Sequence, residues 1–462
     1  MSQGVVIPEE VRRAHRDLGP LNEEFLDFVA NCPAALRRSS FEAVHKYGFY
    51  PLTSWPVFVG GSKLAEMQRA AVELVRLSKK APLAAFRGQT AAMAAFYSFP
   101  DPSLLSMILE EPNGFGGALA RVDLIESEEG LKCLEVNLGA PGGLQVPAAE
   151  SAYLASPVLQ EFLAAQRLGV RCTNALEVLT EHLVEDVLGN LSWSAPELNL
   201  GIVADTDFAP DLRDSIAARM EALLSTVLAR RAPSRRGSVV LGTFAALEMR
   251  PDGIWLRGSR VAGIVEMVAG SWHGRFRPWK TRQVALYNGP AVLVLDDKRN
   301  LALLSELQSS PQFTPDEQEM IRRWVPWTRQ VKPGYTHREG ERISLPDFVA
   351  AHRERLVLKP ARSSQGNDVH LGFSTPPDTW NRVLREALAR RDWIVQDYHE
   401  SRPYLCQEGE EGCSVHDLVW GVFVFGSTYG GGFLRVLPKG RGEAINAARG
   451  ARESILLEVT EV

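Results

Sequence analysis

Apolar and polar residues alternate along two neighbouring segments, residues 121–127 and 131–137, on either side of a short acidic turn. Alternation with a period of two is typical of β-strands whose two faces meet different surroundings. The turn, Glu128-Glu129-Gly130, ends in glycine, which suits a three-residue loop closed by a left-handed residue. We therefore expect a β-hairpin in which Ser127 pairs with Leu131.

The register of this hairpin would place four polar side chains on one face of a sheet. Counting back from the turn sets Asp123 opposite Glu135 and Arg121 opposite Asn137. Facing carboxylates repel each other, and a hard cation relieves the repulsion, because Mg²⁺ accepts oxygen ligands from Asp, Glu and Asn. An adjacent arginine would hold a phosphate oxygen. The alternative is a surface hairpin whose polar face is only solvated, and convergence of the four side chains would decide between the two.

The rest of the chain predicts a mixture of helices and strands, so the fold class we expect is α/β (α+β). Apolar residues at helical spacing predict helices over residues 62–80, 148–168, 174–188, 211–231 and 299–309. A further helix should begin at the capping-box pattern Thr314-Pro315-Asp316-Glu317. Short apolar runs predict strands over residues 198–204, 238–243, 355–360, 393–398, 418–426 and 432–437. The dipeptide Asp252-Gly253 predicts a hairpin turn.

Length and composition indicate a soluble protein of more than one lobe. At 462 residues the chain exceeds the size at which a single core keeps growing. No apolar run reaches the ~18–20 residues that span a bilayer, and the N-terminus lacks the features of a signal peptide, so we expect a cytoplasmic protein. The net charge of −5 argues against a nucleic-acid or membrane partner, and a homodimer stays open.

Several common kinds of site have no support in the sequence. The five cysteines show no C-x-x-C pair, so neither a zinc site nor a disulfide framework is indicated. The chain contains no H-E-x-x-H and no G-x-S-x-G, which weakens the metallohydrolase and serine-nucleophile interpretations.

A second group of candidate residues lies far along the chain. Lys359 ends the apolar strand at residues 355–360, and a lysine on an apolar strand needs an anion, because an uncompensated buried charge costs much free energy. A nucleotide phosphate would supply that anion. The loop Ser363-Ser364-Gln365-Gly366 could cover the phosphates with its backbone N–H groups and act as a lid. Arg435 interrupts another apolar strand and should also face an anion.

The strand at residues 393–398 ends in a polar and an aromatic residue, Gln396 and Tyr398. The backbone groups exposed at such a strand end could bind the edge of an adenine base. An ordinary strand end with polar surface residues remains the alternative.

These residues also carry a resemblance to a known family. Arg121-x-Asp123, then Leu134-Glu135-Val136-Asn137, then Pro141-Gly142 resemble the metal-binding end of the ATP-grasp ligases. In most of that superfamily this element comes last, whereas here the lysine strand follows it. The chain from about residue 110 onward therefore resembles the circularly permuted, glutathionylspermidine-synthetase-like branch.

The resemblance implies an architecture and a set of site residues. It implies permuted ATP-grasp halves at residues 111–195 (metal-binding) and 291–462 (nucleotide-binding), a Rossmann-like α/β domain at 196–290 and a mostly helical region at 1–110. It assigns Asp123, Glu135 and Asn137 to Mg²⁺. The residues it assigns to ATP are Lys298, Lys359, Ser364, Gln365, Gly366, Gln396 and Tyr398. It places Arg121, Lys359 and Arg435 at the transferring phosphoryl group, and Asn446 in the closing Asn-x-x-x-Gly segment.

The activity implied by the resemblance is an ATP-dependent carboxylate-amine ligase. Such an enzyme uses ATP and Mg²⁺, forms an acyl phosphate and releases ADP and phosphate, with a small molecule or peptide as the acid and the amine. The run Gly139-Ala-Pro-Gly-Gly143 is less polar than the sequence that glutathionylspermidine synthetases have there, so their substrates are not carried over. A phosphotransferase and a non-catalytic nucleotide-binding protein remain alternatives.

Overall fold

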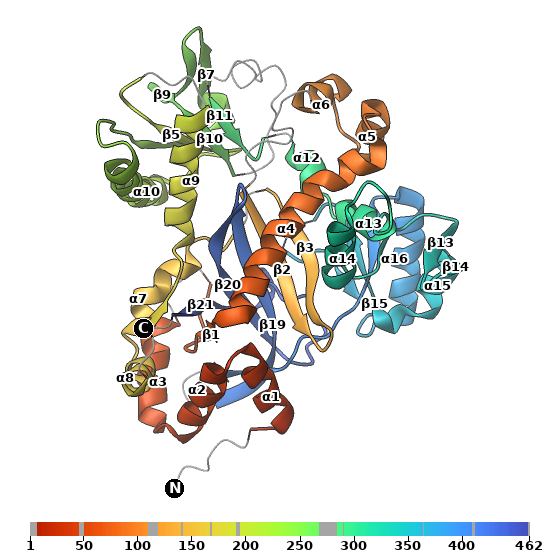
Figure 1. Ribbon diagram of the computed structural model, residues 1–462, viewed down its shortest axis with the longest axis horizontal. Coiled ribbons are helices and arrows are strands. Elements are labelled where there is room, and N and C mark those ends of the chain that lie inside the picture. Colours follow the sequence, from red (N-terminus) through yellow and green to blue (C-terminus); the bar gives the residue numbers. More distant parts are fainter. Residues whose placement is uncertain are drawn as a thin grey trace.

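The computed structural model describes residues 7–45, 50–109, 119–139, 142–166, 169–190, 195–267, 284–289, 291–363, 365–408 and 412–460. The fold is a mixed α/β fold built around several sheets (Figure 1). Within these residues no helix is both long and apolar enough to cross a membrane.

The largest sheet lies at the centre of the molecule and is mainly antiparallel. Its strand order is β1-β21-β20-β19-β2-β3, and two short strands, β4 and β18, pair at its sides. The strands are β1 (Val57–Val59), β2 (Leu119–Ser127), β3 (Gly130–Asn137), β4 (Gly169–Arg171), β18 (Tyr404–Glu408), β19 (Gly412–Phe425), β20 (Thr428–Pro438) and β21 (Arg452–Thr460). The predicted hairpin therefore sits beside the last strands of the chain.

Helix α4 (Gly61–Phe86) covers one face of the central sheet, as Figure 1 shows. Its apolar side, which includes Met67 and Leu74, packs on the even-numbered residues of β2, β19 and β20, such as Val122 and Trp420. Side chains of a strand alternate between its faces, so the odd-numbered residues of these strands point to the opposite side. That opposite face is where the candidate site lies.

The other α-helices described before β2 are α1 (Glu9–Leu18), α2 (Pro20–Asn31), α3 (Ala34–Val44), α5 (Thr90–Tyr97) and α6 (Pro102–Leu109).

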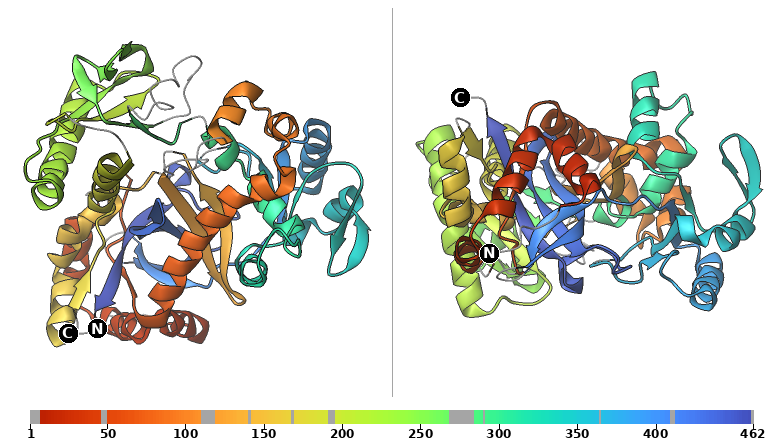
Figure 2. Two further views of the ribbon diagram at one scale, coloured as in Figure 1. Left: turned by 45° about the horizontal axis from the view of Figure 1, so that its top comes forward. Right: turned by 90° about the horizontal axis from the view of Figure 1, so that it is seen from below.

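A second sheet is wholly parallel and has the order β11-β10-β5-β6. Its strands are β5 (Leu200–Ala204), β6 (Val239–Thr243), β10 (Gly263–Glu266) and β11 (Ala285–Tyr287). Helix α10 (Pro210–Arg231) connects β5 to β6, whereas the connection from β6 to β10 is a three-stranded antiparallel sheet of β7 (Leu247–Arg250), β8 (Gly253–Leu256) and β9 (Ser259–Val261). Figure 2 shows this lobe to one side of the central sheet. Here a β-meander replaces the helix that a Rossmann crossover would use.

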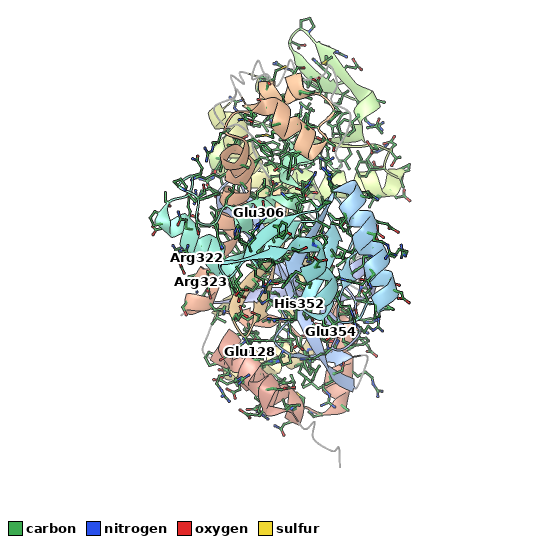
Figure 3. All side chains as sticks on the ribbon, turned by 90° about the vertical axis from the view of Figure 1, so that its right-hand side faces the viewer. Glu128, Glu306, Arg322, Arg323, His352 and Glu354 are labelled. Carbon is green, nitrogen blue, oxygen red and sulfur yellow. The ribbon has the colours of Figure 1, made fainter. Side chains whose placement is uncertain are left out.

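A third sheet, of order β12-β17-β15-β16, is antiparallel and carries the predicted lysine strand. Its strands are β12 (Thr328–Gln330), β15 (Leu356–Pro360), β16 (His370–Leu371) and β17 (Trp393–Asp397). Leu356 and Leu358 pack against α15 (Leu345–Ala351) and α16 (Pro377–Arg390), so Val357 and Lys359 face the other way. Figure 3 views the molecule from the side of this sheet and labels Arg322 and Arg323, two basic residues in the last turn of α14 (Pro315–Trp324). A separate hairpin of β13 (Tyr335–Arg338) and β14 (Glu341–Ser344) lies beside it.

The structure confirms the predicted register at the polar end of the first hairpin but not at its turn. Asp123 pairs with Glu135 and Arg121 with Asn137, as predicted. At the turn, however, Ser127 pairs with Gly130, so the loop has two residues instead of three and the predicted pairing with Leu131 is wrong. A register shift follows Asp123, and Leu134 is the extra residue of a β-bulge. The bulge restores the register that the shorter turn would otherwise have displaced by one residue.

The helix predicted over residues 148–168 is broken into shorter pieces. The structure has a 3-10 turn at Val146–Ala149, then α7 (Glu150–Leu154) and α8 (Pro157–Ala165). Proline lacks an N–H donor and clashes with the preceding turn, so Pro157 begins a helix rather than continuing one. The helices predicted at 174–188 and 211–231 are present as α9 (Ala175–Asn190) and α10, and the capping box at Thr314 is confirmed at the start of α14. All five cysteines are free, as expected.

Candidate functional site

A cavity of about 860 Å³ is lined by residues of both the central sheet and the lysine-bearing sheet. All predicted site residues that the structure describes line it: Arg121, Asp123, Glu135, Asn137, Lys298, Lys359, Gln365, Gly366, Gln396, Tyr398, Arg435 and Asn446. Ser364 lies outside the described residues. The two distant groups of candidate residues therefore meet at one cavity.

The central sheet supplies a row of polar side chains through its register. Asp123 of β2 pairs with Glu135 on one side and with Gly421 of β19 on the other. Gly421 in turn pairs with Phe433 of β20. Two residues further along β20, and on the same face, Arg435 pairs with Glu453 of β21. These residues belong to the odd-numbered set, which faces away from α4 and into the cavity.

Asp123 is 2% exposed and lies between two arginines. Arg121 donates to both of its carboxylate oxygens, from Nε over 2.7 Å and from Nη2 over 3.0 Å. Nη2 of Arg435 lies 2.7 Å from Oδ2 of Asp123. Burial by itself would raise the pKa of Asp123, but Arg121 and Arg435 outweigh burial and hold that pKa well below its usual range. The carboxylate is therefore charged at neutral pH.

The amide group of Asn137 joins the two carboxylates of the hairpin. Its Nδ2 lies 3.4 Å from Oδ2 of Asp123 and 3.3 Å from Oε1 of Glu135. The four predicted side chains thus converge, and those of Arg121 and Asp123 are buried. The alternative of a solvated surface hairpin is therefore wrong.

Glycines make room for this arrangement. A Cβ atom on Gly421 would lie 2.5 Å from the ring of Phe433 and 3.1 Å from Cδ of Arg121. A Cβ atom on Gly143, whose φ is +94°, would lie 2.3 Å from the same ring. The carbonyl of Gly142 accepts a hydrogen bond from Arg121 over 2.9 Å. The missing side chains let the arginine and the ring pack closely beside Asp123.

Lys359 reaches from the third sheet to the bulge in the hairpin. Its Nζ donates to the carbonyl of Leu134 over 3.2 Å and to Oε1 of Gln396 over 2.7 Å. Burial lowers the pKa of Lys359 to about 8, although the nearby Glu135 opposes this effect. The bulge residue thus offers its carbonyl to a residue of the other sheet.

Both ends of the Gln396 side chain bond to protein groups. Besides accepting from Lys359, it donates to Oγ1 of Thr328 over 3.2 Å. It therefore orients Lys359, and the assignment of Gln396 to ATP stays a prediction. Tyr398 directly follows β17, and the centroid of its ring lies 4.8 Å from the centroid of the Phe373 ring at the cavity wall. Burial raises the pKa of Tyr398 to about 12, so its hydroxyl remains protonated.

Lys298 precedes α13 (Arg299–Glu306) and points at the hairpin. Its Nζ lies 3.5 Å from Oε2 of Glu135 and donates to the carbonyl of Ser363 over 2.9 Å. Each lysine therefore contacts both the hairpin and its own lobe.

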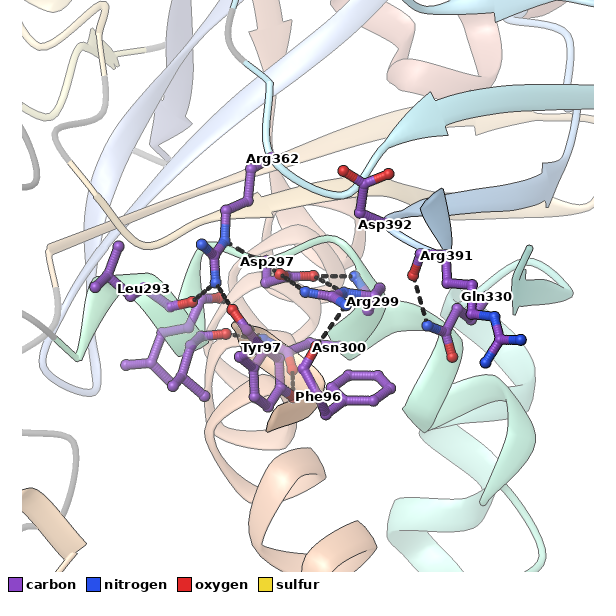
Figure 4. Close-up of polar contacts among 12 residues, drawn as sticks. Phe96, Tyr97, Leu293, Asp297, Arg299, Asn300, Gln330, Arg362, Arg391 and Asp392 are labelled. Atoms are coloured by element: carbon purple, nitrogen blue, oxygen red, sulfur yellow. Dashed lines mark hydrogen bonds and ion pairs between the residues drawn. The ribbon is translucent and has the colours of Figure 1, made fainter. Parts of the chain in front are cut away.

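An ion cluster around the buried Asp297, which precedes Lys298 in sequence, fixes this part of the wall (Figure 4). Asp297 accepts two hydrogen bonds from Arg299, over 2.9 Å and 2.6 Å, and lies 3.3 Å from Nε of Arg362. Arg362 also donates to the carbonyls of Tyr97 in α5 and Leu293 in α12 (Val292–Leu295). Because Arg362 directly precedes the predicted lid loop, the cluster anchors that loop to the N-terminal helices.

Two loops approach each other at the cavity. A Cβ atom on Gly366, whose φ is +69°, would lie 3.2 Å from Ala444 and 3.3 Å from Arg449. Arg449 donates to Oδ1 of Asn367 over 3.4 Å. Asn446 lies in the second loop, and its Oδ1 accepts a hydrogen bond from the backbone of Ala448 over 2.9 Å. That contact gives Asn446 a role in shaping the loop.

The sequence reasoning missed several carboxyl groups of the cavity, among them Asp296, Glu453 and Asp417. Asp296 accepts a hydrogen bond from the backbone of Leu138 over 2.9 Å, and burial raises its pKa to about 6. Glu453 and Asp417 also line the cavity. A signal was present, because Glu453 lies two residues before the apolar run at residues 455–457 and Asp417 directly precedes the apolar run of β19. A lone charge beside apolar strand residues, as at Lys359 and Arg435, is the pattern that would have singled out both residues.

The donor chemistry of the hairpin fits a magnesium ion. Within the described part of the chain, no group of three or more His, Cys, Asp and Glu side chains is arranged to hold a metal. The predicted set is of another kind, with two carboxylates and the amide of Asn137, whose Nδ2 lies within hydrogen-bond distance of both carboxylates. Oxygen donors of this type suit a hard divalent cation. A cation would compete there with the bonds from Arg121 and Arg435 to Asp123.

Comparisons with known proteins bear on the fold. No protein-family model matches the chain, and no curated protein matches it. Among solved structures, a glutathione synthetase-like effector from Globodera pallida in the apo form matches with a TM-score of 0.55 and 14% sequence identity. The match covers 98% of this chain and 99% of that one. The chain thus shares its fold, along nearly its whole length, with a glutathione synthetase-like protein.

Proposed function

We propose that the protein is an ATP-dependent carboxylate-amine ligase, built as a circularly permuted ATP-grasp enzyme, that forms an amide or peptide bond. The likeness to a glutathione synthetase-like fold supports this proposal at the level of architecture. The residue patterns of the hairpin and the lysine strand support it at the level of the site.

One observation carries the proposal, namely the meeting of four buried cationic side chains from two walls at one cavity. Arg121 and Arg435 come from the central sheet, and Lys298 and Lys359 come from the opposite wall. All four cations are at most 9% exposed. Arg121, Arg435 and Lys298 form ion pairs with two carboxylates, Asp123 and Glu135, and Lys359 bonds to neutral oxygens. This group of cations favours an anionic ligand. The triphosphate of ATP has the charge and the size for this cavity.

The first chemical step is the transfer of a phosphoryl group to the acid. A carboxylate oxygen of the substrate attacks the γ-phosphorus of ATP, and the bond from that phosphorus to the bridging oxygen of ADP breaks. Asp123, Glu135 and Asn137 would hold Mg²⁺, which offsets charge on the phosphates. Lys298, Lys359 and the two arginines orient the phosphates, and their contacts to fixed backbone groups keep them in place.

The second step joins the acid to the amine. The amine nitrogen attacks the carbonyl carbon of the acyl phosphate, and the carbon-oxygen bond to the phosphate breaks. Arg435 projects into the cavity and is placed to stabilise the oxyanion of the tetrahedral intermediate. The loops at Gly366 and Ala444 approach each other and would limit the access of water to the acyl phosphate.

The test is to trap the acyl phosphate with hydroxylamine. The full-length protein is incubated with ATP, Mg²⁺, hydroxylamine and a panel of amino acids, dicarboxylic acids and short peptides, and ADP and hydroxamate are measured. We expect ADP and hydroxamate in equal amounts with at least one acid, and neither product from the Asp123→Asn variant or in the presence of excess chelator.

Other products would overturn the proposal in distinct ways. Formation of AMP with a suitable acid would contradict the ADP-forming mechanism. A stable phosphorylated product without hydroxamate would identify a phosphotransferase. Binding of ATP without turnover across the panel would identify a nucleotide-binding module, and Asp123→Asn would then leave the binding of a protein partner intact.

A further inference from the structure

Glu453 is a buried carboxyl group that faces the cavity and has an oxygen without a partner. It is 3% exposed, and its Oε2 has no hydrogen-bond partner among the described residues. Its neighbour in the sheet, Arg435, is 4% exposed, and its Nε likewise lacks a partner in the described part of the chain. Buried polar groups are nearly always hydrogen-bonded, so two open atoms on paired residues point to a missing ligand.

The nearby arginines do not satisfy this carboxyl group. Arg435 directs Nη2 to Asp123 over 2.7 Å, and Arg121 donates to both oxygens of Asp123. Burial raises the pKa of Glu453 to about 7, although the charges of Arg435 and Arg121 oppose the rise. The group is therefore close to its midpoint at neutral pH, where a general base works best.

The backbone around Glu453 is held on both sides. Its N–H donates to the carbonyl of Pro51 over 3.0 Å, and its carbonyl accepts from the N–H of Thr53 over 2.8 Å. Its other strand neighbour is Arg435 of β20. A carboxyl group carried on a backbone that is held in this way needs little reorganisation to position a reacting group.

Other acidic residues at the cavity are engaged differently. Asp123 is bonded to two arginines, Glu135 lies beside Lys298, and Asp296 accepts from a backbone N–H. Asp417 also has a buried oxygen without a partner in the described residues, but the charges that act on it are those of Lys439 and Glu400. Glu453 is thus the open carboxyl group beside Arg435, where the acyl carbonyl is proposed to lie.

We propose that Glu453 binds the amino group of the second substrate and accepts a proton from it during amide formation. The inference rests on the proposed ligase function and assigns its amine subsite. The ligand class is a primary amine, or ammonia, that arrives as its cation. A carboxylate binds the cation, and Arg435 on the adjacent strand holds the oxygen of the acyl group that the amine attacks.

The protons balance with one acceptor on the protein. An alkylammonium loses two protons when it becomes an amide nitrogen. One passes to the carboxylate of Glu453 and from there to solvent. The other leaves with the departing phosphate as hydrogen phosphate, while the carbon-nitrogen bond forms and the carbon-oxygen bond breaks.

The test compares two nucleophiles in the same variant, Glu453→Gln. Hydroxylamine is largely uncharged at neutral pH and a strong nucleophile, so it needs no base, whereas ammonia is mostly protonated. With the acid identified by trapping, we expect the variant to form hydroxamate at close to the wild-type rate. Amide formation from ammonium chloride should fall by about 10²-fold or more, the usual contribution of a general base.

Two further variants separate this role from a structural one. Glu453→Asp keeps the carboxyl group and should retain measurable amide formation, and Asp417→Asn should leave the ratio of amide to hydroxamate unchanged. Thermal unfolding and ATP binding check that each variant is folded.

The outcomes distinguish the two proposals. A wild-type protein that makes no hydroxamate refutes the ligase function itself. Hydroxamate from the wild type, with equal amide formation by Glu453→Gln and wild type, refutes only the role of Glu453. Loss of both products in a folded Glu453→Gln variant, or a wild type that makes hydroxamate but no amide from ammonia, also contradicts the amine subsite.

Discussion

The ammonium group of Lys359 in β15 donates a hydrogen bond to the main-chain carbonyl of Leu134 in β3, over 3.2 Å. Leu134 is the extra residue of the bulge that restores the register of the hairpin. One irregularity of a strand thus has two effects, because it places Asp123 opposite Glu135 and also gives the lysine of the other sheet a fixed acceptor. The contact holds the two walls of the cavity together.

Replacement of this lysine by methionine should impair catalysis more than folding. We expect Lys359→Met to lower kcat/KM by about 10²- to 10³-fold, the usual effect of removing one group that stabilises developing charge. The variant loses the hydrogen bonds to Leu134 and Gln396 but also relieves the cost of a buried ammonium group, so the melting temperature should change little. ADP release and thermal unfolding measure the two effects. The exposed Lys332→Met is the matched control, and equal activity of the two variants would contradict a role for Lys359 in phosphoryl transfer.

Adding one methyl group beside Asp123 should destabilise the protein. In Gly421→Ala the new Cβ atom meets the ring of Phe433 at 2.5 Å and Arg121 at 3.1 Å. Overpacking of this kind costs about 1–3 kcal/mol, and the shift of Arg121 should also lower activity. Urea unfolding measures the cost. The control is Gly189→Ala in α9, where nothing lies within 4 Å of the new Cβ atom. An equally large loss of stability in that variant would show that the clash is not the cause.

The stability of the protein in acid should depend on Glu317. This residue caps α14 and accepts hydrogen bonds from Arg76 over 2.5 Å and Lys80 over 2.6 Å, both in α4. Burial would raise its pKa, but hydrogen bonds from Lys80 and Arg76 outweigh burial and lower the pKa to about 2. A carboxyl group whose folded-state pKa is lowered stabilises the fold above its ordinary pKa, and the stabilisation is lost as the pH falls toward the folded-state value.

Glu317→Gln should therefore destabilise the protein by about 1–2 kcal/mol at pH 7, since both cations are partly exposed. The difference from the wild type should shrink as the pH falls from about 4.5 toward 2. Urea unfolding at several pH values measures it. Glu319→Gln, in the same helix but in an exposed ion pair, should change stability little at any pH.

The ion cluster at Asp297 should be essential to the fold of the cavity wall around Lys298. Asp297→Asn leaves Arg299 without its buried partner and weakens the hold on Arg362. Breaking a buried pair costs about 3–5 kcal/mol, because a charge is left uncompensated. Urea unfolding and ADP release should both show the loss. The control is Asp392→Asn, which removes an exposed partner of Arg390 and should change stability and ADP release little. A stable, active Asp297→Asn variant would show that the cluster is dispensable.

The sequence predicted the parts of the site whose signal is local. Alternation along residues 121–137 predicts the hairpin, and lone charges on apolar strands predict the burial of Lys359 and Arg435. The bulge at Leu134 could not be predicted in this way, because it depends on the two-residue turn and on Lys359, more than 200 residues away in sequence. The expected pairing at Asp123 was correct because two errors of one residue cancelled. Asp296 was missed because its acceptor role depends on the backbone of a distant loop.

The strand order of the central sheet has a consequence for the synthesis of the protein. β2 lies between β3, its neighbour in sequence, and β19, which begins about 275 residues after β3 ends. At a translation rate of about 5–20 residues per second, the hairpin waits roughly 15–55 s on the ribosome before its second neighbour emerges. Throughout that interval the Asp123 strand has an open hydrogen-bonding edge, so the nascent hairpin needs shielding from other chains until the last strands of the polypeptide arrive.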